Sequence, residues 1–257
     1  MRPVLTHTHH HRASLRALKK KIPASSVINS FFFFLGEVEL GLAGAQRFIS
    51  AHTNNAVIHE FWTSLLRNPQ LVRDIARSDQ FRMLGNPQMF ALLQENWRTY
   101  RDPYVRAALF YLLSHTSHSG LPSSGEYKPQ DFGPRHWRPI EQLSASNLHV
   151  TRFQEDDVVK YALSQPRGDY TLYALGRFAY NTLNERFHGG PEETPIDHLN
   201  FHRQIVETHN ERPFVLLYKK HPQVLRLYDQ FHLTMVDRFG ALTADPDNCE
   251  DIIVTNF

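Results

Sequence analysis

Histidine, acidic and cysteine side chains could perform chemistry at a few places in this chain. The segment "HTHHHR", residues 7–12, and the pair His198 and His202, four residues apart on an expected helix, offer imidazole ligands for a metal ion. Adjacent histidines seldom converge on one ion, and the pair lacks the glutamate of an HExxH zinc motif, so we expect no metal site. Cys249 lies in an acidic turn, and the chain contains neither a GxSxG nucleophile motif nor a phosphate-binding glycine loop.

The composition is that of a soluble globular protein. The chain has 257 residues, of which 41% are hydrophobic and 21% charged, and its formal charge of +2 does not by itself argue for nucleic acid. The single cysteine excludes an internal disulfide and suggests a reducing compartment, or a virion. No apolar stretch is long enough to span a membrane, so we expect no membrane partner.

The N-terminal segment is basic and has no acidic residue before Glu37. That composition fits a mitochondrial presequence, and it also fits a basic first helix at 12–21 whose lysines lie near its C-terminal end. We favour the helix, because a hydrophobic strand follows at once and the two together are typical of one folded unit. The compartment stays undetermined.

Apolar runs alternate with helical patterns, as expected of an α/β protein. A nearly continuous apolar run at 27–35 predicts a central strand buried on both faces, and 37–52 is expected to be a helix. Residues 55–62 are expected to form a short second strand that passes into a helix. The later expected strands are 147–153, 170–175, "PFVLLY", and an antiparallel pair formed by "LTMVDRF" and the terminal "DIIVTNF".

Residues 67–118 look helical throughout, which is long for a crossover between strands. A stretch rich in glycine, serine and proline follows at 117–139. The sequence therefore predicts a doubly wound, mostly parallel sheet formed by 1–66 and 147–257, with an inserted helical subdomain at 67–146.

Several stretches together resemble the Dam-like adenine-N6 DNA methyltransferases, whose catalytic motif is DPPY. The stretches are "AVIHEFWTSLLRNPQLV", "FYLLSHTSHSGLPSSGEYKPQDFG", "RGDYTLYAL" and "PFVLLYKKHPQVLRLYDQFHLTMVDRF…EDIIVTNF". The resemblance covers nearly the whole chain. It implies a Rossmann-like methyltransferase sheet, an inserted target-recognition region, S-adenosylmethionine as cofactor and DNA as substrate.

At the strand end where the family has DPPY, this chain has Leu175, Gly176, Arg177 and Phe178. In the family, the acid and a proline carbonyl accept hydrogen bonds from the adenine amino group, and the aromatic ring stacks on the flipped base. Leu175 cannot accept a hydrogen bond, and Arg177 places a cation beside the site of a cationic cofactor. Only Phe178 keeps a possible role, as a stacking surface.

The cofactor positions implied by the resemblance are altered as well. Arg12 falls at the place of a lysine, with histidines where the family has glycines. Gly36 survives after the first strand, but Glu37 and Val38 stand where close approach of the cofactor requires glycine. Glu60 corresponds to the ribose-binding acid. We therefore expect no cofactor.

Basic residues of the insert could neutralise DNA or RNA phosphates, as the resemblance implies, although acidic residues interleave with them. The residues in question are Arg98, Arg101, Arg106 and Lys128. The nearby Asp102-Pro103-Tyr104 imitates part of DPPY, but no strand precedes it. Asp102 as a helix cap, with proline at the first helical position, explains it.

We expect, from this sequence, a catalytically inactive methyltransferase-like protein that acts as a nucleic-acid-binding or assembly scaffold. One alternative is an active S-adenosylmethionine-dependent adenine-N6 methyltransferase, in which Asp169, Glu185 or Glu37 supplies the missing carboxylate. The other is a purely structural component of a virion or an organellar assembly. The expected partners are DNA or RNA, or a larger protein assembly.

Overall fold

The chain divides into two compact units, a sheet unit and a helical unit. The computed structural model describes residues 4–5, 11–81, 86–118, 120–144, 146–155, 157–178, 196–208 and 210–257. Among these, the sheet unit takes its residues from 9–54, 145–182 and 194–257, and the helical unit from 55–144 together with 4–5. The sequence predicted an insert at 67–146, whereas the helical unit spans 55–144.

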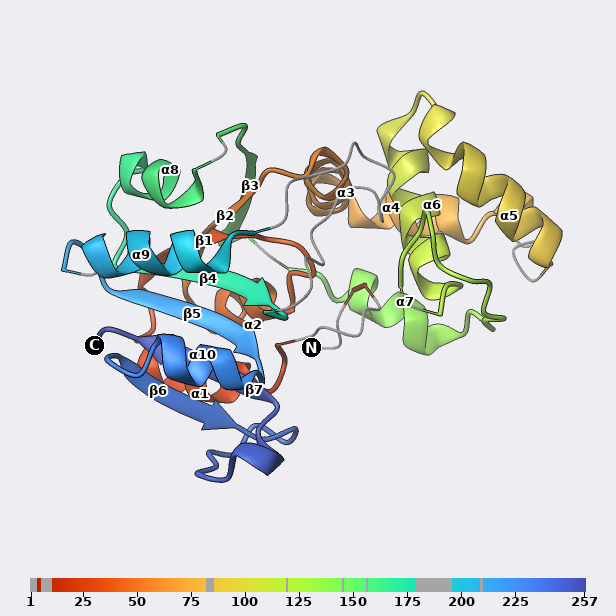
Figure 1. Ribbon diagram of the computed structural model, residues 1–257. Helices are drawn as coiled ribbons and strands as arrows, with labels where there is room; N and C mark the ends of the chain where they lie inside the picture. Colours follow the sequence, from red (N-terminus) through yellow and green to blue (C-terminus); the bar gives the residue numbers. More distant parts are fainter. Residues whose placement is uncertain are drawn as a thin grey trace. The chain divides into compact units, whose positions relative to one another are not determined.

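Seven strands form one sheet in the sheet unit (Figure 1). They are β1 (Val27–Phe31), β2 (Phe48–Thr53), β3 (Leu148–Arg152), β4 (Tyr170–Gly176), β5 (Phe214–Lys219), β6 (His232–Val236) and β7 (Asp251–Thr255). Their spatial order is β3-β2-β1-β4-β5-β7-β6, and β7 is antiparallel to both its neighbours while the other pairs are parallel. The predicted α/β sheet, mostly parallel with antiparallel C-terminal strands, is confirmed.

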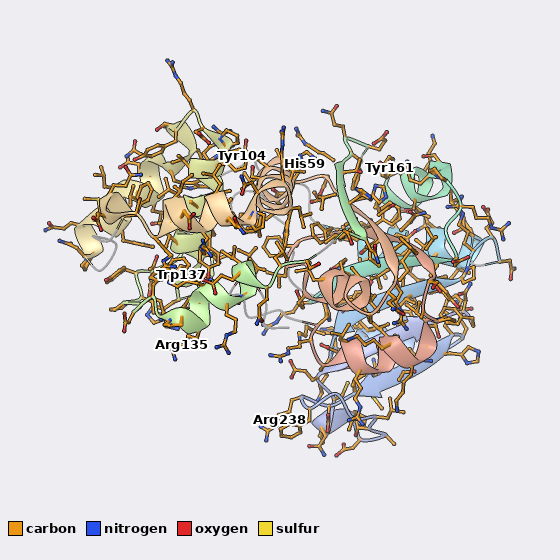
Figure 2. The ribbon with its side chains drawn as sticks, turned by 180° about the vertical axis from the view of Figure 1, so that it is seen from behind. His59, Tyr104, Arg135, Trp137, Tyr161 and Arg238 are labelled. Carbon is orange, nitrogen blue, oxygen red and sulfur yellow. The ribbon has the colours of Figure 1, made fainter. Side chains whose placement is uncertain are left out.

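Helices cover both faces of this sheet. They are α1 (Ser14–Lys21), α2 (Glu37–Ala43), α8 (Val158–Ser164), α9 (His198–Thr208) and α10 (Pro222–Leu227), with a short 3₁₀ helix, η4 (Pro246–Asn248). Alternate residues of a strand point to opposite faces. Thus Phe31 of β1 lies against Tyr161 of α8, which Figure 2 labels, while the preceding Ser30 bonds to Glu39 of α2 on the other face.

The predicted helix at 37–52 is wrong in its second half. Helix α2 ends at Ala43, Gln46 adopts a left-handed backbone with φ 65°, and strand β2 begins at Phe48. The apolar residues fit a helical period by coincidence, because Ile49 belongs to strand β2, where it pairs with Ile28 of β1. Period alone could not separate the short helix from the strand behind it.

The predicted strand at 55–62 is wrong as well, because these residues begin helix α3 (Ala56–Arg67). The Asn55 side chain accepts a hydrogen bond from the Ile58 N–H at 2.9 Å and caps the helix. Phe61 and Leu65 continue its buried stripe at helical spacing. The strand expected at 27–35 also ends early, at Phe31, because Phe32 takes a left-handed backbone with φ 59°.

The helical unit is built around α6 (Pro103–His115), which is buried from residue 107 onward. Its other helices are α3, α4 (Pro69–Ala76), α5 (Pro87–Asn96), the 3₁₀ turn η2 (Trp97–Thr99) and α7 (Pro134–Glu141). Asp102 caps α6 by accepting from the backbone N–H groups of Tyr104 and Val105, at 2.7 and 3.3 Å, as predicted. Within the described residues of both units, every helix is too short or too polar to cross a membrane.

Candidate functional site at the carboxyl edge of the sheet

The carboxyl ends of the parallel strands are the first place to look for a site. Chains of this type bind ligands outside those ends, at the point where the strand order reverses. Here β1 and β4 are neighbours, and the chain continues from β1 toward β2 but from β4 toward β5. The residues after β1 and after β4 therefore meet at this point.

The loop after β1 leads from Phe32 to Gly36, and its residues are buried. Gly36 has φ 72°, a left-handed conformation that glycine adopts without strain, and it stands at the N-terminus of α2. The next residue, Glu37, accepts a hydrogen bond from the His11 backbone N–H at 2.7 Å. Its carboxylate is thus tied to the segment that leads into α1.

A buried group of charged and polar side chains lies at this edge, and we call it the Asp251 cluster: His11, Ser14, Lys219 and Asp251. Asp251 begins β7 and is fully buried, and its carboxylate accepts from the Ser14 hydroxyl at 2.9 Å. The Lys219 Nζ at the end of β5 lies 2.8 Å from Asp251 Oδ1, and His11 Nδ1 lies 3.4 Å from the same oxygen. The His11 Nδ1 and Asp251 Oδ1 atoms are close enough for an ion pair but are not aligned for a hydrogen bond.

The electrostatics of the cluster favour its charged form. Burial by itself raises the pKa of Asp251, but His11 and Lys219 outweigh it and hold that pKa at about 2. Burial likewise disfavours the ammonium of Lys219, yet Asp251 and Glu250 leave its pKa above the ordinary value. The cluster is therefore an internal ion pair at neutral pH, closed by contacts within the chain.

Glu39 is a second unusual carboxyl group near this edge. It is buried on α2, and it accepts a hydrogen bond from the Ser30 hydroxyl at 2.7 Å. Burial raises its pKa to about 7, against the opposing effect of that hydrogen bond. A carboxyl group that is half protonated at neutral pH can exchange a proton, which is a property of many functional sites.

The described residues from Leu175 to Phe178, at the end of β4 and just after it, carry no hydrogen-bond acceptor side chain. Leu175 is buried, Gly176 has φ 67° at an irregularity in the pairing with β5, and Arg177 is exposed. Phe178 stacks on His198 at 4.6 Å and on His221 at 5.0 Å between ring centroids. Its expected stacking surface is therefore already in contact with two imidazole rings.

His198 is held within the same aromatic group. Its Nδ1 lies 3.2 Å from the Tyr218 hydroxyl, and burial lowers its pKa to about 4, so the ring is neutral at physiological pH. His202, four residues further on, packs edge-on against Tyr228 at 4.9 Å. Among the described residues, no group of three or more His, Cys, Asp or Glu side chains could hold a metal ion. Residues 7–10 of the histidine-rich segment lie outside the described residues.

His52 occupies the carboxyl end of β2, where a dinucleotide-binding sheet ordinarily has an acid for the ribose. The ring stacks on Phe31 at 4.7 Å with an interplanar angle of 12°, and its Nδ1 lies 3.3 Å from the Tyr161 hydroxyl. Burial lowers the pKa of His52 to about 4, so the ring carries no charge at neutral pH. Sequence reasoning missed this residue because it placed the second strand at 55–62, after His52.

The three predicted cofactor positions are not brought together in one unit. Gly36 belongs to the sheet unit, and so does Arg12, which is exposed just before α1. Glu60 belongs to the helical unit, where its carboxylate accepts from Arg106 at 2.7 and 2.5 Å. Glu60 therefore has a structural partner.

Arg106 is hydrogen-bonded to the backbone as well as to Glu60. Its guanidinium also donates to the carbonyls of Tyr100 and Arg101, which ties α6 to the turn before it. The remaining predicted nucleic-acid contacts, Arg98, Arg101 and Lys128, are not buried. Lys128 belongs to a loop that packs on α5 through Tyr127 and Phe90, with ring centroids 5.3 Å apart.

The carboxylates of the active-enzyme alternative lie elsewhere. Asp169 precedes β4, at the opposite, amino edge of the sheet, where it accepts from the Val27 N–H at 2.8 Å. Beside it is an open depression lined by Arg167, Tyr170 and Pro213 among others. Glu185 lies outside the described residues.

The chain is an α/β protein whose seven-stranded sheet is mostly parallel, an arrangement compatible with a Rossmann-like fold. No protein-family model matches the chain, and no curated protein sequence matches it either.

Proposed function

We propose that the chain is a methyltransferase-like protein that no longer transfers a methyl group and that acts as a nucleic-acid-binding or assembly scaffold. The strand order supports the first half of this proposal. An antiparallel β7 between β5 and β6 is typical of Rossmann-like methyltransferase sheets, and the sequence resemblance points to the same class. Because a fold can host many functions, the function must be argued from the site.

The observation that carries the proposal is the closed carboxyl edge. A cofactor with an amino-acid carboxylate and a positive sulfonium needs an open glycine loop and unpaired polar groups there. Here Glu37 is bonded to the His11 backbone, and Asp251 and Lys219 pair with each other. The charged side chains of Glu37, Lys219 and Asp251 at this edge are thus engaged within the chain.

Base methylation also lacks its carboxylate acceptor at the end of β4. Of the two acceptors that the adenine amino group needs there, one is a side-chain carboxylate, and the Leu175 side chain cannot replace it. Phe178 is stacked on imidazoles. Of the substitute carboxylates, Asp169 lies at the amino edge of the sheet, and Glu37 is tied to His11.

Cofactor binding is the direct test. We expect no change in the unfolding temperature of the full chain with S-adenosylmethionine or S-adenosylhomocysteine at millimolar concentration. A ligand present at about 100 times its Kd adds about 2.7 kcal/mol, which raises the unfolding temperature of a chain this size by roughly 5–10 °C. A reproducible shift of that size would overturn the hypothesis of an inactive protein.

The feature that could serve the active alternative is the buried Glu39, which accepts a hydrogen bond from Ser30 and whose pKa is raised by burial to about 7. An active enzyme would transfer a labelled methyl group to adenine-containing duplex DNA, and Glu39→Gln would abolish the transfer. Our proposal expects no transfer by either protein.

Nucleic-acid binding separates the scaffold from a purely structural component. The exposed Arg98 and Arg101 flank the end of η2, where they can reach phosphates. In filter binding, Arg98→Gln with Arg101→Gln should lower the slope of log affinity against log salt by about 2. The matched control, Arg135→Gln with Arg138→Gln on α7, removes the same charge and should change the slope little (Figure 2). If the parent chain binds neither DNA nor RNA, only the assembly role remains.

A further inference from the structure

A basic and apolar surface on the sheet unit takes no part in the edge described above. Its basic half is the outer side of α1 and the turn before it. Arg12, Arg16, Lys19 and Lys20 are exposed, and their spacing places them on one side of the helix, while Ala17 and Leu18 face the core. No acidic residue occurs in α1.

The apolar half is the connection between β6 and β7. Gly240 has φ 80°, and a Cβ there would stand 2.9 Å from the Ala13 carbonyl oxygen and 3.7 Å from Arg16 Cβ. The connection is thus packed directly on α1. Beside Gly240, the side chains of Phe239 and Leu242 are 75% and 71% exposed. We give the name α1–loop surface to these two residues together with Arg238 and the four cations of α1 and of the turn before it.

Arg238 adds a cation at the tip of this connection. Its guanidinium lies over the Phe239 ring at 4.6 Å from the centroid, and Figure 2 labels it at the outer end of the sheet unit. Arg238 and the Phe239 ring therefore lie together at this tip, and Leu242 follows three residues after Phe239 in the chain.

Two acidic residues of the connection, Asp237 and Asp245, are hydrogen-bonded within it, whereas the Asp247 side chain is 98% exposed. The Asp237 carboxylate accepts from the N–H groups of Phe239 and Ala241, each at 2.9 Å. Asp245 accepts from the backbone of Asp247 at 2.8 Å, and Asp247 lies 3.6 Å from Lys220. The five cations of the α1–loop surface outnumber the three aspartates of the connection, so the surface keeps a net positive charge.

We propose that the α1–loop surface binds an anionic lipid membrane peripherally. Clustered lysines and arginines are attracted to acidic headgroups, and exposed phenylalanine and leucine side chains enter the boundary between headgroups and acyl chains. A phosphate backbone would engage the same cations, but it offers Leu242 no apolar surroundings. The sequence predicted no membrane partner because no segment can span one, and a peripheral surface requires no such segment.

Vesicle co-sedimentation of the full chain tests this proposal. The parent chain binds phosphatidylcholine vesicles that contain about 30% phosphatidylserine, and binds phosphatidylcholine alone weakly. Lys19→Gln with Lys20→Gln weakens binding about 25-fold, since each cation near such a surface contributes about fivefold. Phe239→Ser with Leu242→Ser weakens it at least about tenfold through lost apolar burial.

The control pair is Arg135→Gln with Arg138→Gln, which removes the same charge from the helical unit and leaves vesicle binding within about twofold of the parent. All substituted side chains are exposed, so each variant should keep the unfolding temperature of the parent. The proposal fails if the parent does not bind anionic vesicles. It also fails if the Arg135 and Arg138 variant loses as much binding as the Lys19 and Lys20 variant. A third outcome also overturns the proposal: the Lys19 and Lys20 variant loses affinity for duplex DNA, while the Phe239 and Leu242 variant keeps its affinity for both DNA and vesicles. The surface is then a nucleic-acid site.

Discussion

Replacing Asp251 by asparagine tests whether the closed cluster at the carboxyl edge is a strong internal contact. An asparagine at this position would keep the shape of the side chain and could still accept a hydrogen bond from Ser14. It would remove the negative charge that faces Lys219 and His11. The substitution thus isolates the charge from the packing.

Two independent arguments give the magnitude. A carboxyl group whose pKa falls from 3.8 to about 2 on folding contributes about 2.5 kcal/mol at neutral pH. Removing one partner of a buried ion pair costs about 3–5 kcal/mol, because the other charge is left buried. Glu250 stays 2.8 Å from the Lys219 ammonium, so the lower end applies. We therefore expect Asp251→Asn to lower the free energy of unfolding by about 3 kcal/mol.

The pH dependence has a defined sign. Because folding lowers the pKa of Asp251, its contribution is fully present above about pH 4 and is lost as the pH falls from about 4 to 2. The parent should lose stability steeply in that window, and Asp251→Asn should lose about 2.5 kcal/mol less there.

Urea unfolding followed by far-UV circular dichroism measures both effects. All three tryptophans, Trp62, Trp97 and Trp137, belong to the helical unit, so their fluorescence follows that unit in the same samples. Lys220→Met is the matched control, because it breaks an exposed contact with Asp247 and should cost under about 1 kcal/mol. An Asp251→Asn protein whose free energy of unfolding lies within about 1 kcal/mol of the parent would refute the reasoning.

Two further substitutions test other buried features. Burial lowers the pKa of His115 to about 4 in the folded protein. As the pH falls, His115 is therefore protonated in the unfolded chain before it is protonated in the folded chain. The free energy of unfolding should fall by about 3 kcal/mol between pH 6.5 and 4. His115→Gln should flatten that part of the curve in tryptophan fluorescence, and an unchanged curve would contradict the assignment. Gly36→Ala should lower stability by about 1–2 kcal/mol because of its φ of 72°, whereas Gly133→Ala, with open space around its Cβ, should be neutral in the same thermal unfolding assay.

The sequence was informative where a local rule decides the structure. The apolar runs that became β1, β4 and β5 are buried strands, and residues 214–219 are all buried. Asp102 followed by proline began a helix because a carboxylate cap and a fixed φ act within one turn. The antiparallel end of the sheet followed from two short strands joined by a turn-rich loop.

The segment from 37 to 62 could not be predicted from its period. A helix of seven residues followed by a strand of six imitates one longer helix, because apolar residues recur in both. The useful signal was Asn55, whose cap fixes the start of α3 and forces the strand to lie before it. With β2 placed correctly, His52 falls at the strand's carboxyl end.

The candidate site was only partly predictable, because its contacts join distant parts of the chain. Ser14 and Asp251 are separated by 237 positions, and no local pattern reports such a pair. A hint existed in Lys219 and Asp251, since each is a charged residue at the end of an apolar strand. A buried charge at such a place requires a partner, and the structure supplies it.

If the proposed function holds, the closed edge also bears on how a cofactor site can be lost while its fold remains. Strand order depends on the apolar core, whereas the edge depends on a few side chains, so the two can change separately. If a cofactor had to open the Asp251 cluster, the apparent affinity would fall with the open fraction. A cost of about 2.5 kcal/mol would weaken binding roughly 60-fold, which turns a micromolar site into one near about 0.1 mM. Under the proposed function, internal pairing would thus weaken cofactor binding independently of the residues at the end of β4.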